Sequence, residues 1–297
     1  MPDPVELLEA GQRCENSGSL DRALEKYAAA AAETIDPDII AEALRRQSSV
    51  YRLRSQWEEA LDTARRSAAT AERARLPDLV AEALNAEAAV YQCRGEFDRA
   101  IPTFERILST TENERIRGVA LQNLGFIAAR SGDLETAESR FRDSLGCFQR
   151  AGYRSGEAVA LTNAAAVALD REDFAGAQSI AEQAVRLAKE IEDLNLLAIA
   201  TKNFAESLAG QRRFADAEEH ASAALGYFAL TDNKWRQVEC YQFLGDVSLC
   251  QHHHETARSC FERGAKLARE IGAASELAAL EERIARLSSA ESKPSRE

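Results

Sequence analysis

The sequence has few of the residues and motifs on which most catalytic and cofactor sites depend. It contains four histidines and six cysteines in 297 residues, and no two cysteines are spaced as Cys-x-x-Cys. It has no Walker-type phosphate loop, no HExxH zinc motif and no GxSxG nucleophile elbow. These absences exclude the common enzyme signatures and a disulfide framework. We therefore expect no enzymatic activity and no cofactor.

The short histidine run near the C-terminal end is the one feature that suggests a metal. His252, His253 and His254 follow Cys250 closely, and Cys260 lies further along. A zinc site needs four converging ligands, whereas three adjacent histidines in a turn point in different directions. We expect no metal site, a packing role for His254, and buried free thiols for the six cysteines.

Long apolar runs and an N-terminal signal are also absent. The longest apolar stretch without a charge runs from Ala158 to Leu169, whereas a membrane span needs roughly 18 residues. The first residues are acidic and lack the apolar centre of a signal peptide. The net charge of −12 disfavours contact with phosphate backbones. We expect a cytoplasmic protein that neither inserts into membranes nor binds nucleic acid.

What the sequence does contain is alanine and a repeat. Proline and aromatic residues are scarce, which favours helices. A short pattern with alanine in its sixth place recurs seven times, at spacings of 37 or 40 residues. We call these alanines the anchors; they are Ala23, Ala60, Ala100, Ala137, Ala177, Ala217 and Ala257.

Other positions repeat in register with the anchors. Twelve residues before each anchor the residue is small: Gly11, Ser48, Ala88, Gly125, Ala165, Ala205 and Gly245. Three residues before it six of seven are large and apolar: Leu20, Trp57, Phe97, Leu134, Phe174, Phe214, and then His254. Offsets of three and four place residues on one helix face. Each unit is therefore expected to be a helical hairpin, with the large residue filling the gap between its two helices, and hairpins must stack to bury their faces.

This pattern resembles the tetratricopeptide repeat over about residues 4–275. The common period is 34 residues, so the longer spacing resembles the branch found in kinesin light chains and bacterial peptide-sensing regulators. The resemblance implies an all-α, right-handed superhelix of seven repeats starting near residues 4, 41, 81, 118, 158, 198 and 238. A capping helix over 276–290 and a disordered tail over 291–297 would follow.

The resemblance also implies a non-catalytic scaffold or adaptor that binds a peptide or partner segment in its concave groove. Fourteen residues before the anchor, three consecutive repeats carry Asn123, Asn163 and Asn203. An amide can pair with both polar groups of a peptide backbone. With repeats roughly 10 Å apart and about 3.3 Å per extended residue, this asparagine ladder would hold every third residue. The alternative is that these amides bond to neighbouring helices.

Further residues are expected on the same inner face: Gln122, Phe126, Arg130, Thr162, Lys202 and Glu206. The second repeat adds Arg45, Arg46 and Arg52. Because arginine recognises carboxylates bidentately, these residues suggest an acidic partner. The alternative is that they pair with nearby glutamates on the helix surface.

Two other functions stay open at this stage. One is a regulatory sensor that tightens around a small signalling peptide. The other is a structural assembly protein that associates with further copies of itself. Repeat proteins share one fold across unrelated tasks, so the fold does not choose among them.

Overall fold

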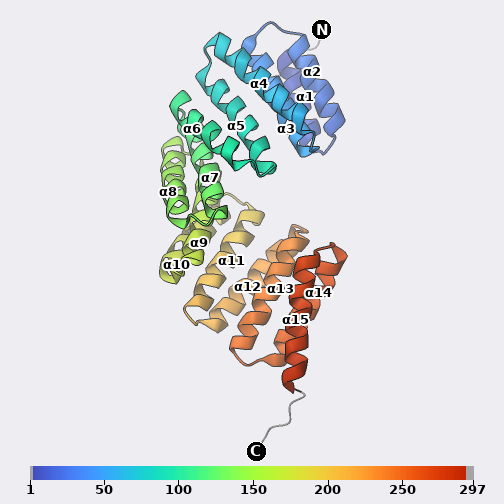
Figure 1. Cartoon of the computed structure of the whole chain (residues 1–297), viewed down its shortest axis with the longest axis vertical. Helices are drawn as coiled ribbons and strands as arrows, with labels where there is room; N and C mark the ends of the chain where they lie inside the picture. Colours follow the sequence, from blue (N-terminus) through green and yellow to red (C-terminus); the bar gives the residue numbers. More distant parts are fainter. Residues whose placement is uncertain (1–2, 292–297) are drawn as a thin grey trace, which may run out of the picture. The chain divides into compact units, whose positions relative to one another are not determined.

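The computed structural model describes residues 3–291, and within them the chain forms fifteen α-helices joined by short turns (Figure 1). The first eight helices are α1 (Pro4–Asn16), α2 (Leu20–Ala32), α3 (Pro37–Leu53), α4 (Trp57–Ala74), α5 (Pro77–Cys93), α6 (Phe97–Thr110), α7 (Glu114–Arg130) and α8 (Leu134–Ala151). They are followed by α9 (Arg154–Asp170), α10 (Phe174–Glu190), α11 (Leu194–Gly210), α12 (Phe214–Leu230), α13 (Lys234–Cys250), α14 (His254–Glu270) and α15 (Ala274–Glu291). The fold is an all-α solenoid of helical hairpins.

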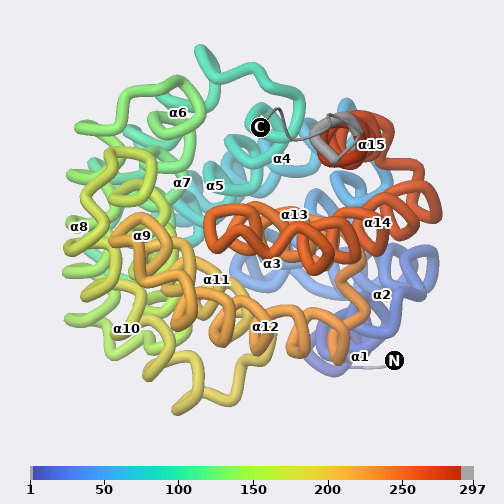
Figure 2. Tube along the Cα trace, turned by 90° about the horizontal axis from the view of Figure 1, so that it is seen from below, coloured from blue at the N-terminus to red at the C-terminus, as the bar shows by residue number. Residues whose placement is uncertain are grey.

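The chain divides into two compact units. Unit 1 comprises residues 1–153 and unit 2 comprises residues 154–297. Unit 1 holds four hairpins, α1–α2 to α7–α8, whereas unit 2 holds three hairpins followed by α15. Within unit 1, α5 and α7 lie on the inner side of α6 and α8 (Figure 2). In these two hairpins the first helix is thus the one that faces inward.

Several first helices begin after a residue whose side chain caps the helix. The Asp36 side chain accepts a hydrogen bond from the backbone of Asp38, and Asn113 caps α7 in the same way. The first helices begin at residues 4, 37, 77, 114, 154, 194 and 234. After the first repeat, these starts lie four residues before those expected from the sequence. The capped turns place each helix about one turn earlier than the repeat positions alone indicated.

The turn inside every hairpin uses one left-handed residue, five positions before the anchor. In repeats one, three and four it is glycine, with φ of 74°, 74° and 81° at Gly18, Gly95 and Gly132. In the other repeats a residue with a side chain adopts this conformation: Ser55, Glu172, Arg212 and His252. A left-handed residue costs little for glycine and more for residues with a Cβ. The turn geometry is therefore constant although its sequence is not.

The small residue twelve before the anchor is buried in all seven repeats. Where this residue is glycine, an aromatic ring from the second helix fills the space that a Cβ would occupy. The pairs are Gly11 with Tyr27, Gly125 with Phe141, and Gly245 with Phe261. Where it is alanine or serine, the residue four after the anchor is alanine, except that Ala88 is followed by Phe104. The two positions together keep the paired helices close.

The large residue three before the anchor packs differently from the sequence expectation. A Cβ on Gly210 of α11 would lie 2.2 Å from the ring of Phe174 at the start of α10. Phe174 therefore packs against the first helix of the next hairpin, and the gap within a hairpin is filled by the residue four after the anchor. His254, expected to fill an apolar position, is exposed instead, because its polar ring gains nothing from burial without a partner.

Helix α15 packs on the last hairpin. Leu280 and Leu287 of α15 are buried in one cluster with Val238, Phe261 and other residues of α13 and α14. Arg283 of α15 adds an ion pair to Asp246 of α13, with 3.0 Å between Nε and Oδ1. The end of the array is thus covered by a helix. Apart from Glu291, the last residue of α15, the expected disordered tail lies outside the described residues.

Candidate functional site

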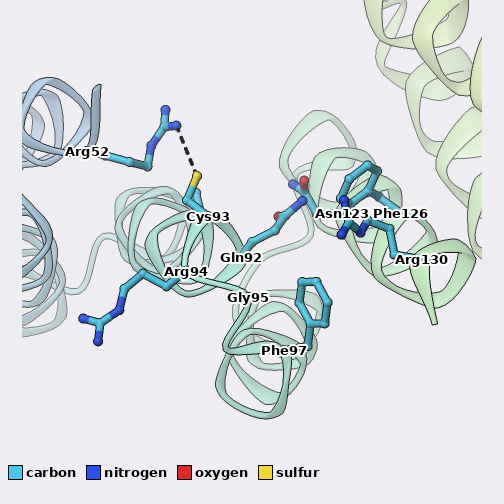
Figure 3. Close-up of a pocket in the computed structure, with 10 residues that line it drawn as sticks. Arg52, Gln92, Cys93, Arg94, Gly95, Phe97, Asn123, Phe126 and Arg130 are labelled. Carbon is cyan, nitrogen blue, oxygen red and sulfur yellow. Dashed lines mark hydrogen bonds between the residues drawn. The ribbon is translucent and has the colours of Figure 1, made fainter. Parts of the chain in front are cut away.

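The C-terminal ends of α3, α5 and α7 border a groove of about 650 Å³ in unit 1 (Figure 3). It is lined by Arg52 of α3, Ala89, Gln92 and Cys93 of α5, Arg94 and Gly95 of the following turn, Phe97 of α6, and Asn123, Phe126 and Arg130 of α7. The α7 residues are spaced three and four apart, so they share one helix face. The groove therefore crosses three consecutive repeats.

The charge of the groove is opposite to that of the whole chain. Its lining contains three arginines and no aspartate or glutamate, whereas the sequence has 49 acidic and 37 basic residues. Arg94 is neutralised by ion pairs with Glu58 and Glu96, at N–O distances of 3.1 and 2.5 Å. The other two arginines, Arg52 and Arg130, are not neutralised in this way.

Arg52 and Arg130 lie on opposite sides of the groove, with Gln92 and Cys93 between them (Figure 3). The Arg52 guanidinium makes a weak contact with the thiol of Cys93, with 3.8 Å between Nη1 and Sγ. Arg130 is exposed, and its side chain forms no hydrogen bond or ion pair with any residue that the structure describes. Both guanidiniums can therefore receive an external acceptor.

The groove also offers apolar and amide groups. Phe126 is 41% exposed, so part of its apolar ring is open to a partner. Phe97, at the start of α6, also lines the groove and is half-buried. The Asn123 amide donates through Nδ2 to the Val119 carbonyl oxygen at 3.0 Å, which leaves its oxygen as an acceptor. Gln122, the preceding residue, lies outside the groove lining, and its buried Oε1 has no donor among the described residues.

The N-terminal halves of the same helices differ sharply from the groove. Glu42 accepts hydrogen bonds from Arg45 and Arg46, and Glu82 pairs with Arg45 and Arg115. Burial opposes ionisation of Glu42, but the hydrogen bonds from the two arginines outweigh it and lower its pKa. This network ties α3, α5 and α7 together. Arg45 and Arg46 are thus paired with nearby glutamates, which was the alternative to a role in partner binding.

The candidate residues of unit 2 take part mainly in internal contacts. Asn203 is buried, and its Nδ2 donates to the Thr162 carbonyl oxygen at 3.0 Å, linking α11 to α9. The Thr162 hydroxyl is buried and donates to the Ala158 carbonyl oxygen. Lys202 pairs with Glu206 at 2.5 Å, one helical turn away. Asn163 is half-buried on α9.

Of the residues singled out from the sequence, the groove brings together Arg52, Asn123, Phe126 and Arg130. Asn123 belongs to unit 1, whereas Asn163 and Asn203 belong to unit 2. Sequence reasoning missed Gln92, Cys93 and Phe97 as part of the groove. Their positions in the repeat, eight, seven and three residues before the anchor, are the signal that could have found them.

The expectation of buried thiols is correct for some cysteines and wrong for others. Cys147 and Cys240 are buried, but Cys93 and Cys250 are exposed. In the described part of the chain, no group of three or more histidine, cysteine or acidic side chains is arranged to hold a metal ion. No helix in that part is long and apolar enough to cross a membrane.

A family model described as tetratricopeptide repeat matches residues 39–113 and 117–190, which together make half of the sequence. The chain belongs to the tetratricopeptide repeat family. Its members typically act as non-catalytic scaffolds for protein interactions, and the all-α hairpin array agrees with that class. No curated protein matches the sequence significantly.

Solved structures share the fold of this tetratricopeptide protein at low sequence identity. A signal-transduction ATPase with a tetratricopeptide repeat sensor from Pyrococcus horikoshii has a TM-score of 0.75 and 14% identity, and the match covers 93% of this chain but 44% of the ATPase. The apo form of RapI has a TM-score of 0.71 and 14% identity, with 90% and 77% of the two chains covered.

A Rap protein complexed with competence and sporulation factor has a TM-score of 0.67 and 12% identity. The match covers 93% of this chain and 80% of the Rap protein. At these identities the likeness shows the fold alone. The present chain also spans less than half of the ATPase, so that protein's activity is not transferable from the match.

Proposed function

We propose that this protein is a scaffold that holds a peptide or partner segment in the groove between α3, α5 and α7. The observation that carries the proposal is the exposed ring of Phe126 in a groove that spans three repeats. Burying an aromatic side chain is a large source of binding free energy. The Asn123 oxygen beside it can accept a hydrogen bond from the backbone of an extended segment.

The contrast within unit 1 supports this location. The N-terminal halves of the inner helices are occupied by the ion-pair network around Glu42 and Glu82. The C-terminal halves expose Phe126 and Arg130. A partner segment therefore gains more contacts at the groove than over the network, where it would have to compete with existing pairs.

A regulatory version of the same function has one supporting observation. One of the similar structures is a Rap protein complexed with competence and sporulation factor, so a solenoid of this fold can hold such a factor. A peptide-responsive role for the present chain would use the same groove and would differ in its output. Both versions are expected to act in the cytoplasm.

The test is a pull-down from an extract of the source cells, comparing the wild type with Phe126→Ala and Trp235→Ala. Trp235 is a matched control because it is an aromatic residue of similar exposure, 47%, on α13 of unit 2. The proposal predicts that at least one protein is recovered with the wild type and with Trp235→Ala but not with Phe126→Ala. Equal recovery by all three proteins would remove the groove as the site and favour association through another face.

A further inference from the structure

The arrangement of the two unneutralised arginines specifies the chemistry of the segment that the groove holds. We infer that the partner segment carries two carboxylates, separated by about five or six residues, which bind Arg52 and Arg130. This inference rests on the proposed function of the groove. It adds the class of partner and the spacing of its charged groups.

The charge of the groove favours an acidic segment. The charged residues of its lining are all arginines, in a chain with an excess of acidic residues. Arg94 already has two glutamates, and the ion-pair network uses Arg45, Arg46 and Arg115. Arg52 and Arg130 remain with no carboxylate among the described residues. A guanidinium presents a planar fork that matches a carboxylate, and such bonds are stronger than neutral ones.

The spacing of the helices sets the separation of the two carboxylates. Arg52 lies on α3 and Arg130 on α7, and α5 packs between these helices. Adjacent helices pack roughly 8–10 Å apart, so the two arginines belong to helices about 16–20 Å apart. An extended chain advances about 3.3 Å per residue, so this distance corresponds to about five or six residues. Figure 3 shows the two guanidiniums at opposite sides of the groove, as this spacing requires.

The position of Phe126 indicates where the apolar side chain of the partner lies. Phe126 precedes Arg130 by one helical turn on α7, and the two side chains lie together at one side of the groove (Figure 3). Next to Arg52 the groove is lined by the polar Cys93, while Gln92 extends toward Asn123 in the middle of the groove. An apolar side chain of the partner should therefore stand next to the carboxylate that binds Arg130. The groove is asymmetric in this respect and fixes the direction of the segment.

The experiment uses the full chain and an array of synthetic peptides that are acetylated and amidated, so that only side chains carry charge. Each peptide has two glutamates that stand two to nine positions apart in its sequence, with leucine beside one of them. The same peptides with glutamine at both places form a second set. Binding is measured by fluorescence anisotropy for the wild type, Arg52→Gln, Arg130→Gln and Phe126→Ala. Arg140→Gln on α8 is the control, because Arg140 also has no partner in the described part and lies outside the groove.

The expected result is tightest binding at a separation of five or six residues. Arg52→Gln and Arg130→Gln should each weaken that peptide about tenfold, as expected for loss of a charge-assisted bond. Arg140→Gln should leave its affinity unchanged. Replacing the glutamate beside leucine should cost affinity in the wild type but not in Arg130→Gln, which identifies the partner of that carboxylate.

Two outcomes would overturn the inference, and they differ in what they mean for the groove. Binding that is lost in Phe126→Ala, but is insensitive to glutamate spacing and to both arginine substitutions, would refute the dicarboxylate spacing and keep the groove as a binding site. If no peptide binds to the wild type more tightly than to Phe126→Ala, the dicarboxylate spacing is refuted as well. In that case the pull-down with Phe126→Ala decides separately whether the groove itself is used.

Discussion

The ring of Phe261 lies so close to Gly245 that a Cβ added at residue 245 would lie 2.3 Å from its Cε1 atom. Gly245 belongs to α13 and Phe261 to α14, the two helices of the last hairpin. The contact thus sets how closely the hairpin closes. It also explains why glycine is used within a helix, where it lowers intrinsic stability.

Gly245→Ala should lower the free energy of unfolding by about 1–3 kcal/mol, because the added methyl overpacks the contact with Phe261. Gly226 of α12 is the matched control, since a Cβ there meets nothing within 4 Å. Gly226→Ala should raise the free energy of unfolding by up to about 1 kcal/mol, through helix propensity. Urea unfolding followed by circular dichroism measures both. Equal effects of the two substitutions would show that the contact is not tight.

The left-handed turn residues give a second prediction about stability. Gly132 has φ of 81°, and a Cβ there would meet no atom within 4 Å, so Gly132→Ala tests backbone strain without a clash. It should cost about 1 kcal/mol. Arg212 occupies the same turn position with φ of 62°, and Arg212→Gly should gain about 0.5 kcal/mol after the entropy cost of glycine. A gain from Gly132→Ala in thermal unfolding would contradict the assigned turn geometry.

The cysteines should differ in reactivity toward a thiol reagent such as dithionitrobenzoate. Burial raises the pKa of Cys147 to about 11 and that of Cys240 to about 12, and both thiols are enclosed. Cys93 and Cys250 are exposed and should react first, because the thiolate is the reactive form and needs access. A groove partner should protect Cys93 and leave Cys250 reactive. Mass spectrometry of the labelled peptides resolves each site, and protection of both or neither would place the partner elsewhere.

The pair of Glu114 and Arg150 gives a pH prediction. Arg150 donates hydrogen bonds of 2.8 and 2.9 Å to the Glu114 carboxylate, and these contacts lower its pKa from 4.5 to about 2. Because the folded pKa is depressed, the pair stabilises the fold above about pH 4.5 and loses that effect as pH falls toward 2. The pair is largely exposed, so solvent screening keeps its contribution small.

Arg150→Gln should therefore be slightly less stable than the wild type at pH 7, and the difference should narrow below about pH 4.5. Urea unfolding at neutral, mildly acidic and strongly acidic pH measures the trend. Arg142→Gln is a fitting comparison, since Arg142 also pairs with a glutamate, Glu138, on α8. A difference for Arg150→Gln that grows at acid pH would contradict the assigned pair.

The fold could be predicted from the sequence because the residues that determine helix packing recur at a regular spacing. The anchor alanines and the small residues twelve positions earlier recur in every repeat, and both sets are buried. The first helices after the first repeat begin four residues before the expected repeat starts. Each start depends on a capping turn whose residue differs between repeats, from Asp36 to Leu76 to Asn113. The packing of Phe174 on Gly210 of the next hairpin depends on how hairpins stack. A pattern within one repeat does not contain that information.

The site could be predicted only in part, for a related reason. Sequence offsets identified the helix face that carries Asn123, Phe126 and Arg130, but they could not show which polar groups are already paired. Arg46 and Arg52 stand six residues apart on the same helix. One of them bonds to Glu42, and the other reaches the groove. That difference follows from the neighbouring residues in space, above all from acidic side chains on adjacent helices. The asparagine ladder as a ligand contact stays a prediction.

Site-directed photo-crosslinking tests the central claim most directly. A benzophenone amino acid is placed at Gln92, which lines the groove, or at Gln149, an exposed residue of α8 outside it. The protein is irradiated in the source cells, and the crosslinked peptides are identified by mass spectrometry. Binding in the groove predicts a partner peptide crosslinked at residue 92, rich in acidic residues, and absent from the variant at residue 149. A partner crosslinked at residue 149 and never at residue 92 would contradict binding in the groove.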